Sequence, residues 1–501
     1  MKKIKLLFLP FIIFANVNLI YTDNAQAATA ETACLKAGAV DYSHIIPCYR
    51  EKLAAEPLSY WFMSNQLYGD VEVNRYQMIS QMWSPDDLVS PVKWQEDVAI
   101  AIPDNQKGNR ALIAVDISED ILIKVARATK TVVISLHSIP SRDLIYANDN
   151  KPLIEDDSIA RSWRLTMDDP ATRQTLPLHV PMAASISQTI RMAKKELVKE
   201  NINKFIVTGA SKRGWATWLS AISDPDVEAI VPIVADVLNT QEVMKHMYQS
   251  YGGNWPIAFA PYYQQGIDKT AATADFANLM KVEDPLQYLG TAYQSRLAIP
   301  KYIINASGDD FFMPDNTRFY YDKLPGEKSL RVAPNTGHNG ILAFTQQSLI
   351  TFLNRIQNNV TLPVIDSKLV QEGNSQQLEV KFSETPAKVV RWTAVNPVAR
   401  DFRYACGIQY VPTTLTMTSP NSLSIPVSFT SPGWEASFVE ATFKDGYVAT
   451  TQVSIFPDNK YPTAAPPSKG GACTTLPGRG IDQPSIAKSV NSNTEQLIVN
   501  R

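Results

Sequence analysis

The chain carries two hydrophobic patterns, one after the other. From about residue 72 to residue 360, short apolar runs alternate with stretches in which apolar residues recur every three or four positions. This alternation of strand and helix signals predicts an α/β fold around a mostly parallel sheet. From residue 364 to about 456, short runs alternate apolar and polar residues between Pro, Gly and Asn turns. We therefore expect a larger domain over residues 28–363, a small β-sandwich over 364–460 and a tail rich in Pro, Gly and Ser over 461–501.

The first half of the larger domain is expected to form a sheet that begins antiparallel and becomes parallel. Thr131 to Leu136 is a continuous apolar, β-branched run, as in buried parallel strands. Residues 139–180 are polar and predict an irregular segment, so we interpret Glu155, Asp156 and Asp157 as solvated charges in preference to a metal site. Other strands are predicted at Tyr76–Trp83, Trp94–Ile102 and Ala111–Val115, and helices at Ile121–Arg127 and from Pro181 onward.

A strand, a sharp turn and a helix are predicted around Ser211. The apolar run that begins at Lys204 ends in Gly-Ala-Ser, and a helical stripe starts at Trp215. A nucleophile elbow has this form, because the turn exposes a serine oxygen above the sheet. The spacing departs from G-x-S-x-G, since Gly214 comes one residue late. The alternative is a serine that only caps the helix.

Two later loops carry the other groups that an activated serine needs. Asp309 and Asp310 follow the predicted strand that starts at Ile299, and His338 follows the strand that starts at Leu330. The order serine, acid, histidine is that of hydrolases with this elbow, and strand ends of one α/β sheet meet at one edge. The histidine accepts the serine proton and the carboxylate orients the imidazole. Asp236, after the apolar run Val227–Val234, is a further possible acid.

Four stretches of the chain resemble the PhoPQ-activated pathogenicity-related proteins, a branch of the α/β-hydrolase superfamily. The resemblance covers residues 57–360, with its most specific parts at Gly-Ala-Ser-Lys-Arg-Gly-Trp, Trp255-Pro256, Ser-Gly-Asp-Asp-Phe-Phe-Met-Pro-Asp and Pro-Asn-Thr-Gly-His. It implies an α/β-hydrolase fold, and the family pattern S-G-D-x-F-F-x-P-D implies Asp309 as the acid. The turn is also similar to that of glucuronoyl esterases, which implies that the Lys212 side chain can bind an acidic group of a substrate.

The oxyanion hole and the substrate pocket are assigned from the same comparison of patterns. The backbone N–H of Lys212, directly after the serine, is the first expected oxyanion donor. The second is expected in the loop His137–Asp143, at Ser138, although this loop departs from the Pro-Asn-Gln of the resembled family. Residues 238–296 predict a helical, aromatic insertion that caps the nucleophile, with Trp255 and Tyr262 as candidate substrate contacts.

Residues 1–27 are expected to be a cleaved signal peptide. Three lysines precede an apolar run, and Ala25-Gln26-Ala27 supplies an A-x-A cleavage site. The formal charge is −2, and it becomes −4 without this segment, which carries three lysines and one aspartate. So mild a charge gives no argument for binding nucleic acid or anionic membranes. No later stretch is apolar and long enough to span a bilayer.

The four cysteines form two separated pairs, Cys34 with Cys48 and Cys406 with Cys473. In an exported protein, an even count of cysteines suggests disulfides, and we expect local pairing although three connectivities are possible. No Cys/His cluster has metal spacing, so we expect neither a metal nor a cofactor.

Together these patterns predict a secreted or periplasmic serine hydrolase that cleaves an ester or amide bond through Ser211, His338 and Asp309. The expected substrate is a small molecule, a peptide or a saccharide ester. Two alternatives stay open, because fold alone does not fix function. One is a secreted serine peptidase, and the other is a non-catalytic, virulence-related binding or signalling protein on a hydrolase scaffold.

Overall fold

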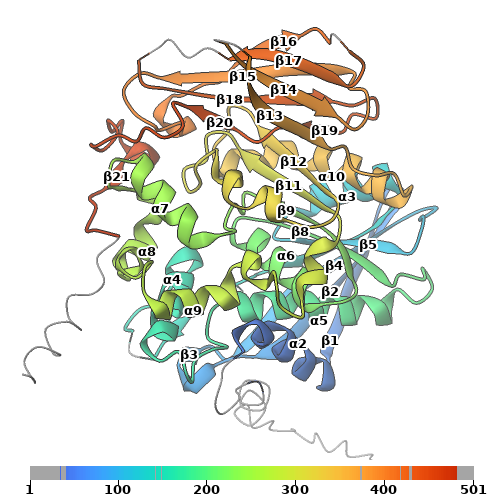
Figure 1. The fold of residues 1–501 in the computed structure, drawn as a ribbon. Helices are drawn as coiled ribbons and strands as arrows, with labels where there is room; N and C mark the ends of the chain where they lie inside the picture. The colour runs from blue at the N-terminus through green and yellow to red at the C-terminus, as the bar shows by residue number, and fades with distance from the viewer. Residues whose placement is uncertain are drawn as a thin grey trace, which may run out of the picture.

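The computed structural model describes residue 34 and residues 41–481, apart from 141–142, 148, 373–374, 418 and 428–431. The predicted signal peptide and the part of the tail after residue 481 lie outside these residues. Figure 1 shows a larger α/β part with a smaller β-rich part stacked on it, coloured orange.

A nine-stranded sheet forms the centre of the larger part, in the order β1-β2-β4-β6-β5-β8-β9-β11-β12. The pairs from β1 to β6 in this order are antiparallel, and the five pairs from β6 to β12 are parallel. The prediction of a sheet that begins antiparallel and becomes mostly parallel is therefore confirmed. In spatial order, the strands are β1 (Ser59–Tyr68), β2 (Val71–Met82), β4 (Lys93–Pro103), β6 (Val132–His137), β5 (Arg110–Val115), β8 (Lys204–Ala210), β9 (Val227–Ile233), β11 (Lys301–Ala306) and β12 (Lys328–Ala333).

Helices cover both faces of this sheet, because successive strand side chains point to opposite sides. In β8, Val207 belongs to one hydrophobic core and Ile206 to another. The first core lies under α2, α5 and α6, and the second lies under α3 and α10. The bounds of these helices are α2 Ile45–Ala55, α5 His179–Glu196, α6 Lys212–Ser223, α3 Glu119–Thr129 and α10 Leu342–Gln357.

The expected irregular segment before α5 contains a helix, α4 (Glu155–Asp168). That part of the sequence prediction was wrong. Ile159, Trp163 and Met167 recur every four residues and are buried, which is a helical stripe. The acidic residues that were interpreted as solvated loop charges form the first turn of α4, where carboxylates interact favourably with the helix dipole. A short ribbon, β3 (Val89–Ser90) with β7 (Ile145–Tyr146), precedes this helix.

Between β9 and β11 the chain leaves the sheet for a mostly helical insertion, at the left of Figure 1. It comprises α7 (Thr240–Ser250), β10 (Trp255–Pro256), α8 (Ala260–Gln264), α9 (Ala274–Glu283) and short 3-10 turns. The insertion packs against α4, and Phe276 of α9 meets Trp163 of α4 edge to face.

The smaller part contains two antiparallel sheets. The alternating runs after residue 364 therefore form strands, as the sequence pattern predicts. The last run, over residues 448–456, contains two short strands that both pair with the same neighbour. The first sheet is β13 (Ile365–Glu372), β14 (Ser375–Phe382) and β17 (Ser422–Val427); the second is β16 (Val411–Leu415), β15 (Lys388–Asn396), β18 (Trp434–Thr442), β19 (Val448–Thr450) and β20 (Ser454–Phe456).

Two disulfides join the cysteines as expected, Cys34 to Cys48 and Cys406 to Cys473. After the second disulfide, β21 (Thr475–Leu476) pairs with β10 of the insertion. The chain end therefore ties the C-terminal part to the cap. Among the described residues, no helix combines the length and apolar character needed to cross a membrane.

Candidate active site

Ser211 lies at the sharp turn between β8 and α6, with φ 57° and ψ −127°. A positive φ is uncommon for a residue with a side chain, and such strain gathers at functional sites. The Ser211 N–H donates to Ile233 O at 2.8 Å, which ties the turn to β9. The side chain makes no capping hydrogen bond to α6. The structure therefore favours the exposed elbow over a serine that only caps the helix.

Gly214, which comes one residue later than the second glycine of G-x-S-x-G, allows α6 to approach the sheet. A Cβ added to Gly214 would lie 2.8 Å from Gly209 O and 2.8 Å from Ala235 Cβ. A Cβ added to Gly209 would lie 2.7 Å from Arg213 O. Neither position has room for a side chain, so the two glycines set the tight packing that places Ser211 at the helix start.

His338 and Asp309 form a buried pair in the loops after β12 and β11. His338 Nδ1 lies 3.0 Å from Asp309 Oδ1 and 2.9 Å from Oδ2. Asp309 Oδ1 also accepts the backbone N–H groups of Phe311 and Phe312, at 2.8 and 3.2 Å. These contacts fix the carboxylate and the tautomer of the imidazole, because a ring with Nδ1–H presents an unprotonated Nε2.

Among the described residues, neither of the two other candidate acids hydrogen-bonds to the imidazole ring. Asp310 Oδ1 accepts the backbone N–H of His338, at 3.4 Å. Asp236 is buried and accepts the Tyr320 hydroxyl, and burial raises its pKa to about 7. Asp309 is therefore the carboxylate that the structure brings to His338.

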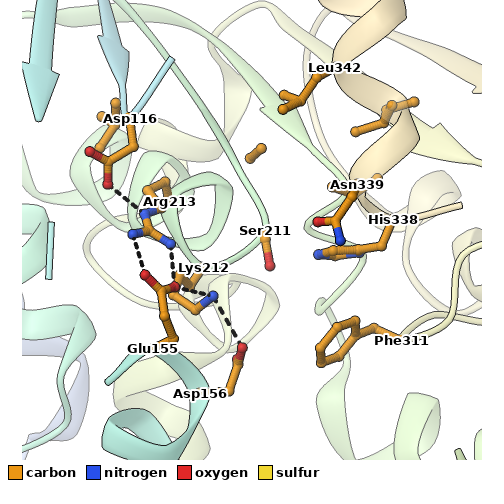
Figure 2. Close-up of a pocket in the computed structure, with 14 residues that line it drawn as sticks. Asp116, Glu155, Asp156, Ser211, Lys212, Arg213, Phe311, His338, Asn339 and Leu342 are labelled. Carbon is orange, nitrogen blue, oxygen red and sulfur yellow. Dashed lines mark hydrogen bonds and ion pairs between the residues drawn. The ribbon is translucent and has the colours of Figure 1, made fainter. Parts of the chain in front are cut away.

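The charge of Asp309 changes the basicity of His338. Burial by itself lowers the pKa of His338, but the negative charge and hydrogen bond of Asp309 outweigh it, so the pKa lies above the usual 6.5. Figure 2 shows the His338 ring and the Ser211 hydroxyl facing each other across a pocket. Within the described residues no hydrogen bond joins them, and catalytic contacts are frequently long without substrate.

Two cavities meet at Ser211. The larger, of about 370 Å³, has a mixed lining: charged and polar residues that include His338, Asn339, Asp116 and Glu155 face apolar ones such as Leu342. The smaller, of about 70 Å³, is lined mainly by apolar side chains of α4, α6, the insertion and the acid loop. Its walls include Trp163, Trp215, Val243, Met244, Met247 and Phe312.

A charged cluster lies beside the elbow in the larger cavity (Figure 2). Lys212 Nζ lies 2.7 Å from Glu155 and 3.1 Å from Asp156. Arg213 lies 2.6 Å from Glu155 and 2.7 Å from Asp116. Burial opposes ionisation of Glu155, but hydrogen bonding and charge from Arg213 lower its pKa to about 2. The Lys212 ammonium is thus already paired with two carboxylates, contrary to its expected role with an acidic substrate group.

Of the two expected oxyanion donors, the structure supports Lys212 and not Ser138. Lys212 is the first residue of α6, so its N–H has no acceptor within the helix and can donate to a substrate oxygen. Ser138 does not line either cavity at Ser211. Its N–H donates to Asp116 Oδ1 at 2.9 Å, so the structure does not support it as a donor. The cavity is instead bordered by the end of β5, which pairs with β8: Val115 is the last residue of this strand and Asp116 follows it.

Of the two aromatic residues predicted to contact substrate, Tyr262 lines the smaller cavity and Trp255 does not. Trp255 is fully buried and stacks on Phe259, with ring centroids 4.6 Å apart. Phe259 in turn stacks on Tyr262 at 5.1 Å. Trp255 therefore supports the cavity wall from behind.

The loops of Asp309 and His338 are held by the C-terminal part of the chain. Tyr404 N–H donates to Gly308 O at 2.9 Å. The Asn335 side chain donates to Tyr410 O at 2.9 Å and accepts Tyr410 N–H at 2.6 Å. A Cβ on Gly308 would lie 2.6 Å from Tyr404 N, so only glycine permits this approach.

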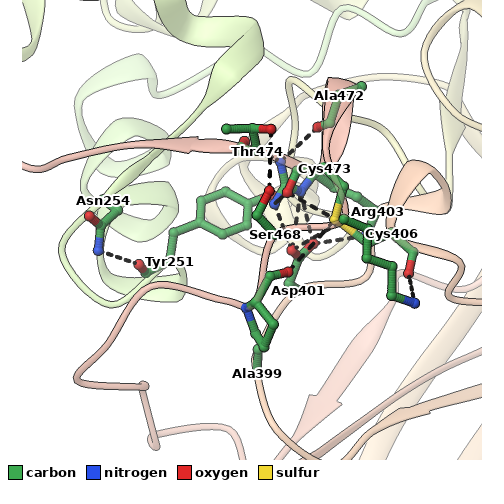
Figure 3. Close-up of polar contacts among 12 residues, drawn as sticks. Tyr251, Asn254, Ala399, Asp401, Arg403, Cys406, Ser468, Ala472, Cys473 and Thr474 are labelled. Atoms are coloured by element: carbon green, nitrogen blue, oxygen red, sulfur yellow. Dashed lines mark hydrogen bonds and ion pairs between the residues drawn. A yellow bond between two sulfur atoms is a disulfide. The ribbon is translucent and has the colours of Figure 1, made fainter.

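The bracing segment, which we define as residues 399–410, is itself fixed by buried contacts (Figure 3). Arg403 pairs with Asp401 at 2.7 Å and donates to Ala472 O at 2.9 Å. The Cys406–Cys473 disulfide joins the same two stretches. An Asp401 carboxylate oxygen and the two sulfurs lie within 4.8 Å of one another, but disulfide sulfurs are not thiolates and do not ligate metals in this form.

The sequence analysis did not name Asp116 or the bracing segment, and it interpreted Glu155 and Asp156 as solvated charges. Asp116, Glu155 and Asp156 line the larger cavity. The helical stripe of α4 could have placed Glu155 and Asp156 on an ordered helix. No local signal could have joined residues 404 and 410 to the acid and base loops.

Comparisons with known proteins agree with the family resemblance. A family model described as PhoPQ-activated pathogenicity-related protein matches residues 46–403. Autocrine proliferation repressor protein A of Dictyostelium discoideum is 30% identical over 444 residues, which cover 79% of this chain and 88% of that protein.

Several solved esterases are also similar, at low identity. An acetyl xylan esterase from Paenibacillus sp. R4 matches with a TM-score of 0.43 and 13% identity, over 65% of this chain and 98% of that one. A glucuronoyl esterase from Solibacter usitatus matches with a TM-score of 0.36 and 11% identity, over 60% and 87%.

Proposed function

This chain belongs to the family of PhoPQ-activated pathogenicity-related proteins, and we propose that it is a serine hydrolase that cleaves an ester or amide bond through an acyl-enzyme. One observation carries the proposal. A strained serine faces a histidine whose Nδ1 is held by both oxygens of a buried carboxylate. Nucleophile, base and orienting acid are the three groups that this chemistry requires.

The reaction follows from the positions of these groups. Ser211 Oγ attacks the substrate carbonyl carbon while His338 Nε2 accepts the hydroxyl proton, and Asp309 stabilises the imidazolium. The Lys212 N–H, at the positive end of α6, stabilises the oxyanion, and one such donor supplies roughly 10² to 10³ in rate. His338 then protonates the leaving group, and water releases the acyl group by the same steps in reverse order.

We further propose that the protein is exported. Two disulfides favour an oxidising compartment. An exported hydrolase would meet small esters, peptides or saccharide esters outside the cytoplasm, and the larger cavity is of ligand size.

A signalling role is the second candidate, and the name of the relative in Dictyostelium discoideum, an autocrine proliferation repressor, favours it. A protein that signals without catalysis does not need the Asp309–His338 pair. Activity of the purified protein separates the two candidates.

The test is hydrolysis of a panel of p-nitrophenyl esters and aminoacyl p-nitroanilides by the mature protein, with Ser211→Ala and His338→Ala as variants. We expect ester or anilide cleavage that falls by about 10⁴-fold or more in each variant. Circular dichroism checks that the variants fold. Cleavage that persists in both folded variants, or no cleavage by the folded wild type, would overturn the proposal. The preferred leaving group distinguishes an esterase from a peptidase.

A further inference from the structure

The smaller cavity at Ser211 has no role in the proposed chemistry beyond touching the nucleophile. We propose that it binds the acyl group of the substrate, that this group is short and uncharged, and that the larger cavity binds a polar alcohol. This inference rests on the proposed function and adds its substrate class, the ester of a short acid with a polar alcohol.

The position of His338 decides which side of the substrate enters which cavity. His338 must protonate the oxygen of the leaving group, so that group has to lie beside the imidazole. His338 lines the larger cavity and is not among the residues that line the smaller one. The leaving alcohol therefore occupies the larger cavity, and the acyl group extends from Ser211 into the smaller one.

The size of the smaller cavity limits the acyl chain. Its volume is about 70 Å³, roughly half of the ~150 Å³ in an engineered protein cavity that holds benzene. An acetyl to butyryl chain fits such a space, and an octanoyl chain or an aromatic ring does not.

The walls of the cavity are packed, so they do not yield easily. Trp163 meets Trp215 edge to face, with centroids 5.5 Å apart, and lies 5.3 Å from Tyr262. Met244 and Met247 are buried at 4% and 5% exposure and close the side formed by α7. Forcing a longer chain into a packed site shifts several side chains together.

The charges around the cavity select against a charged acyl group. Lys212 is the one cation that lines the cavity within the described residues, and it is paired with Glu155 and Asp156. Asp156 also accepts the Tyr262 hydroxyl at 3.1 Å. A carboxylate on the acyl chain would lose its hydration without gaining a free cation.

The larger cavity suits an alcohol with several hydroxyl groups. Its lining is mixed, but one side holds the carboxylates Asp116, Glu155 and Asp156, which are paired with Lys212 and Arg213. These groups offer many acceptors and donors but little net charge. During turnover, the serine–acyl bond forms as the alcohol–acyl bond breaks, and water then yields the short acid and regenerates the serine.

The test is kcat/KM for p-nitrophenyl acetate, butyrate, octanoate and hemisuccinate. For the wild type, we expect octanoate and hemisuccinate each to be about 100-fold poorer than butyrate, because a pocket discriminates by roughly this factor against groups that do not fit. Met247→Ala enlarges the cavity and should improve octanoate relative to acetate by about tenfold, since truncation of a buried side chain leaves space. Met192→Ala, a buried methionine of α5 outside both cavities, is the matched control and should leave the ratio unchanged.

The outcomes separate this inference from the proposed function. Hydrolysis without discrimination among the acyl groups, or with octanoate preferred, overturns the acyl-site assignment while the hydrolase proposal stands. Equal changes of the octanoate ratio in Met247→Ala and Met192→Ala overturn it as well. If the folded wild type hydrolyses none of the esters and a fluorophosphonate labels no serine, both the acyl-site assignment and the hydrolase proposal are overturned.

Discussion

The two halves of the proposed active site are built in different ways. The proposed nucleophile, Ser211, sits on consecutive residues of one strand, one turn and one helix, and glycines 209 and 214 set the packing around it. The acid and the base sit on two loops that contact a third segment far along the chain, residues 399–410. One half is fixed locally, and the other is braced by the C-terminal part of the chain.

Under the proposed function, this difference gives the C-terminal part a role in positioning the acid and the base. Buried polar contacts there converge on the catalytic loops. Asp315, in the acid loop, pairs with Arg400 at 2.6 Å and with His246 of α7 at 2.9 Å, all three buried. Burial opposes ionisation of Asp315, but the charges of His246 and Arg400 hold its pKa well below the usual range. The bracing segment thus links the sandwich, the cap and the acid loop.

The largest effect is expected from removing the charge of the acid. Asp309→Asn should lower kcat by about 10⁴-fold, because an amide holds the wrong tautomer of the imidazole. Asp310→Asn and Asp236→Asn remove carboxylates that do not contact the ring, so each should cost far less. Steady-state kinetics of the three variants measures this. A larger loss in Asp236→Asn than in Asp309→Asn would contradict the assignment of the acid.

The second largest effect is expected from removing the disulfide that holds the bracing segment, compared with removing the other disulfide. The double variant Cys406→Ser/Cys473→Ser frees the bracing segment and should lower kcat by about 10²-fold, since small misplacements of catalytic groups are that costly. Cys34→Ser/Cys48→Ser is the matched control, because that disulfide ties Cys34 to Cys48 in α2 and does not involve the bracing segment. Thermal melting of both variants separates loss of stability from loss of geometry. Equal kcat in the two variants would contradict the claim that the bracing segment positions the acid and base loops.

A smaller effect is expected on the nucleophile side. Glu155→Gln removes one partner each from Lys212 and Arg213, but Asp156 and Asp116 remain. Because backbone packing sets the elbow, kcat/KM should fall by no more than about tenfold, the cost of one or two partly exposed ion pairs. Glu242→Gln, an exposed residue of α7, is the control. Loss of activity comparable to Asp309→Asn would show that the charged cluster, and not the turn, positions Ser211.

The smallest effect is a displacement of the pH profile. His338 must be neutral to accept a proton, and its pKa is raised above 6.5 by Asp309. The acid limb of kcat/KM should therefore lie above pH 6.5, and activity should be lost as pH falls through it. In Asp309→Asn, the residual activity should show this limb at lower pH. An acid limb well below pH 6 in the wild type would contradict the pairing.

The local half of the site could be predicted from the sequence, and the braced half only in part. Ser211 follows from a contiguous strand, turn and helix signal. Asp309 and His338 follow from their places after strands and from the family pattern. Asn335 and Tyr410, by contrast, are 75 residues apart, and no periodicity connects them.

The errors have specific physical causes. The Ser138 prediction places the second donor in the loop where the resembled family carries Pro-Asn-Gln, after β6. In the structure β5, and not β6, lies beside the strand that carries Ser211, and strand order has no local signature. In α4, the apolar stripe of Ile159, Trp163 and Met167 is interrupted by polar residues, so the segment does not look helical in the sequence. The carboxylates of its first turn were therefore interpreted as solvated loop charges.

The most direct test of the central claim, that Ser211 is an activated nucleophile, is labelling of the mature protein with a fluorophosphonate probe and mapping of the labelled peptide. We expect one labelled residue, Ser211, with no labelling of Ser211→Ala and strongly slowed labelling of His338→Ala. A folded wild-type protein that stays unlabelled while a known serine hydrolase reacts alongside, or a label on another serine, would contradict the account.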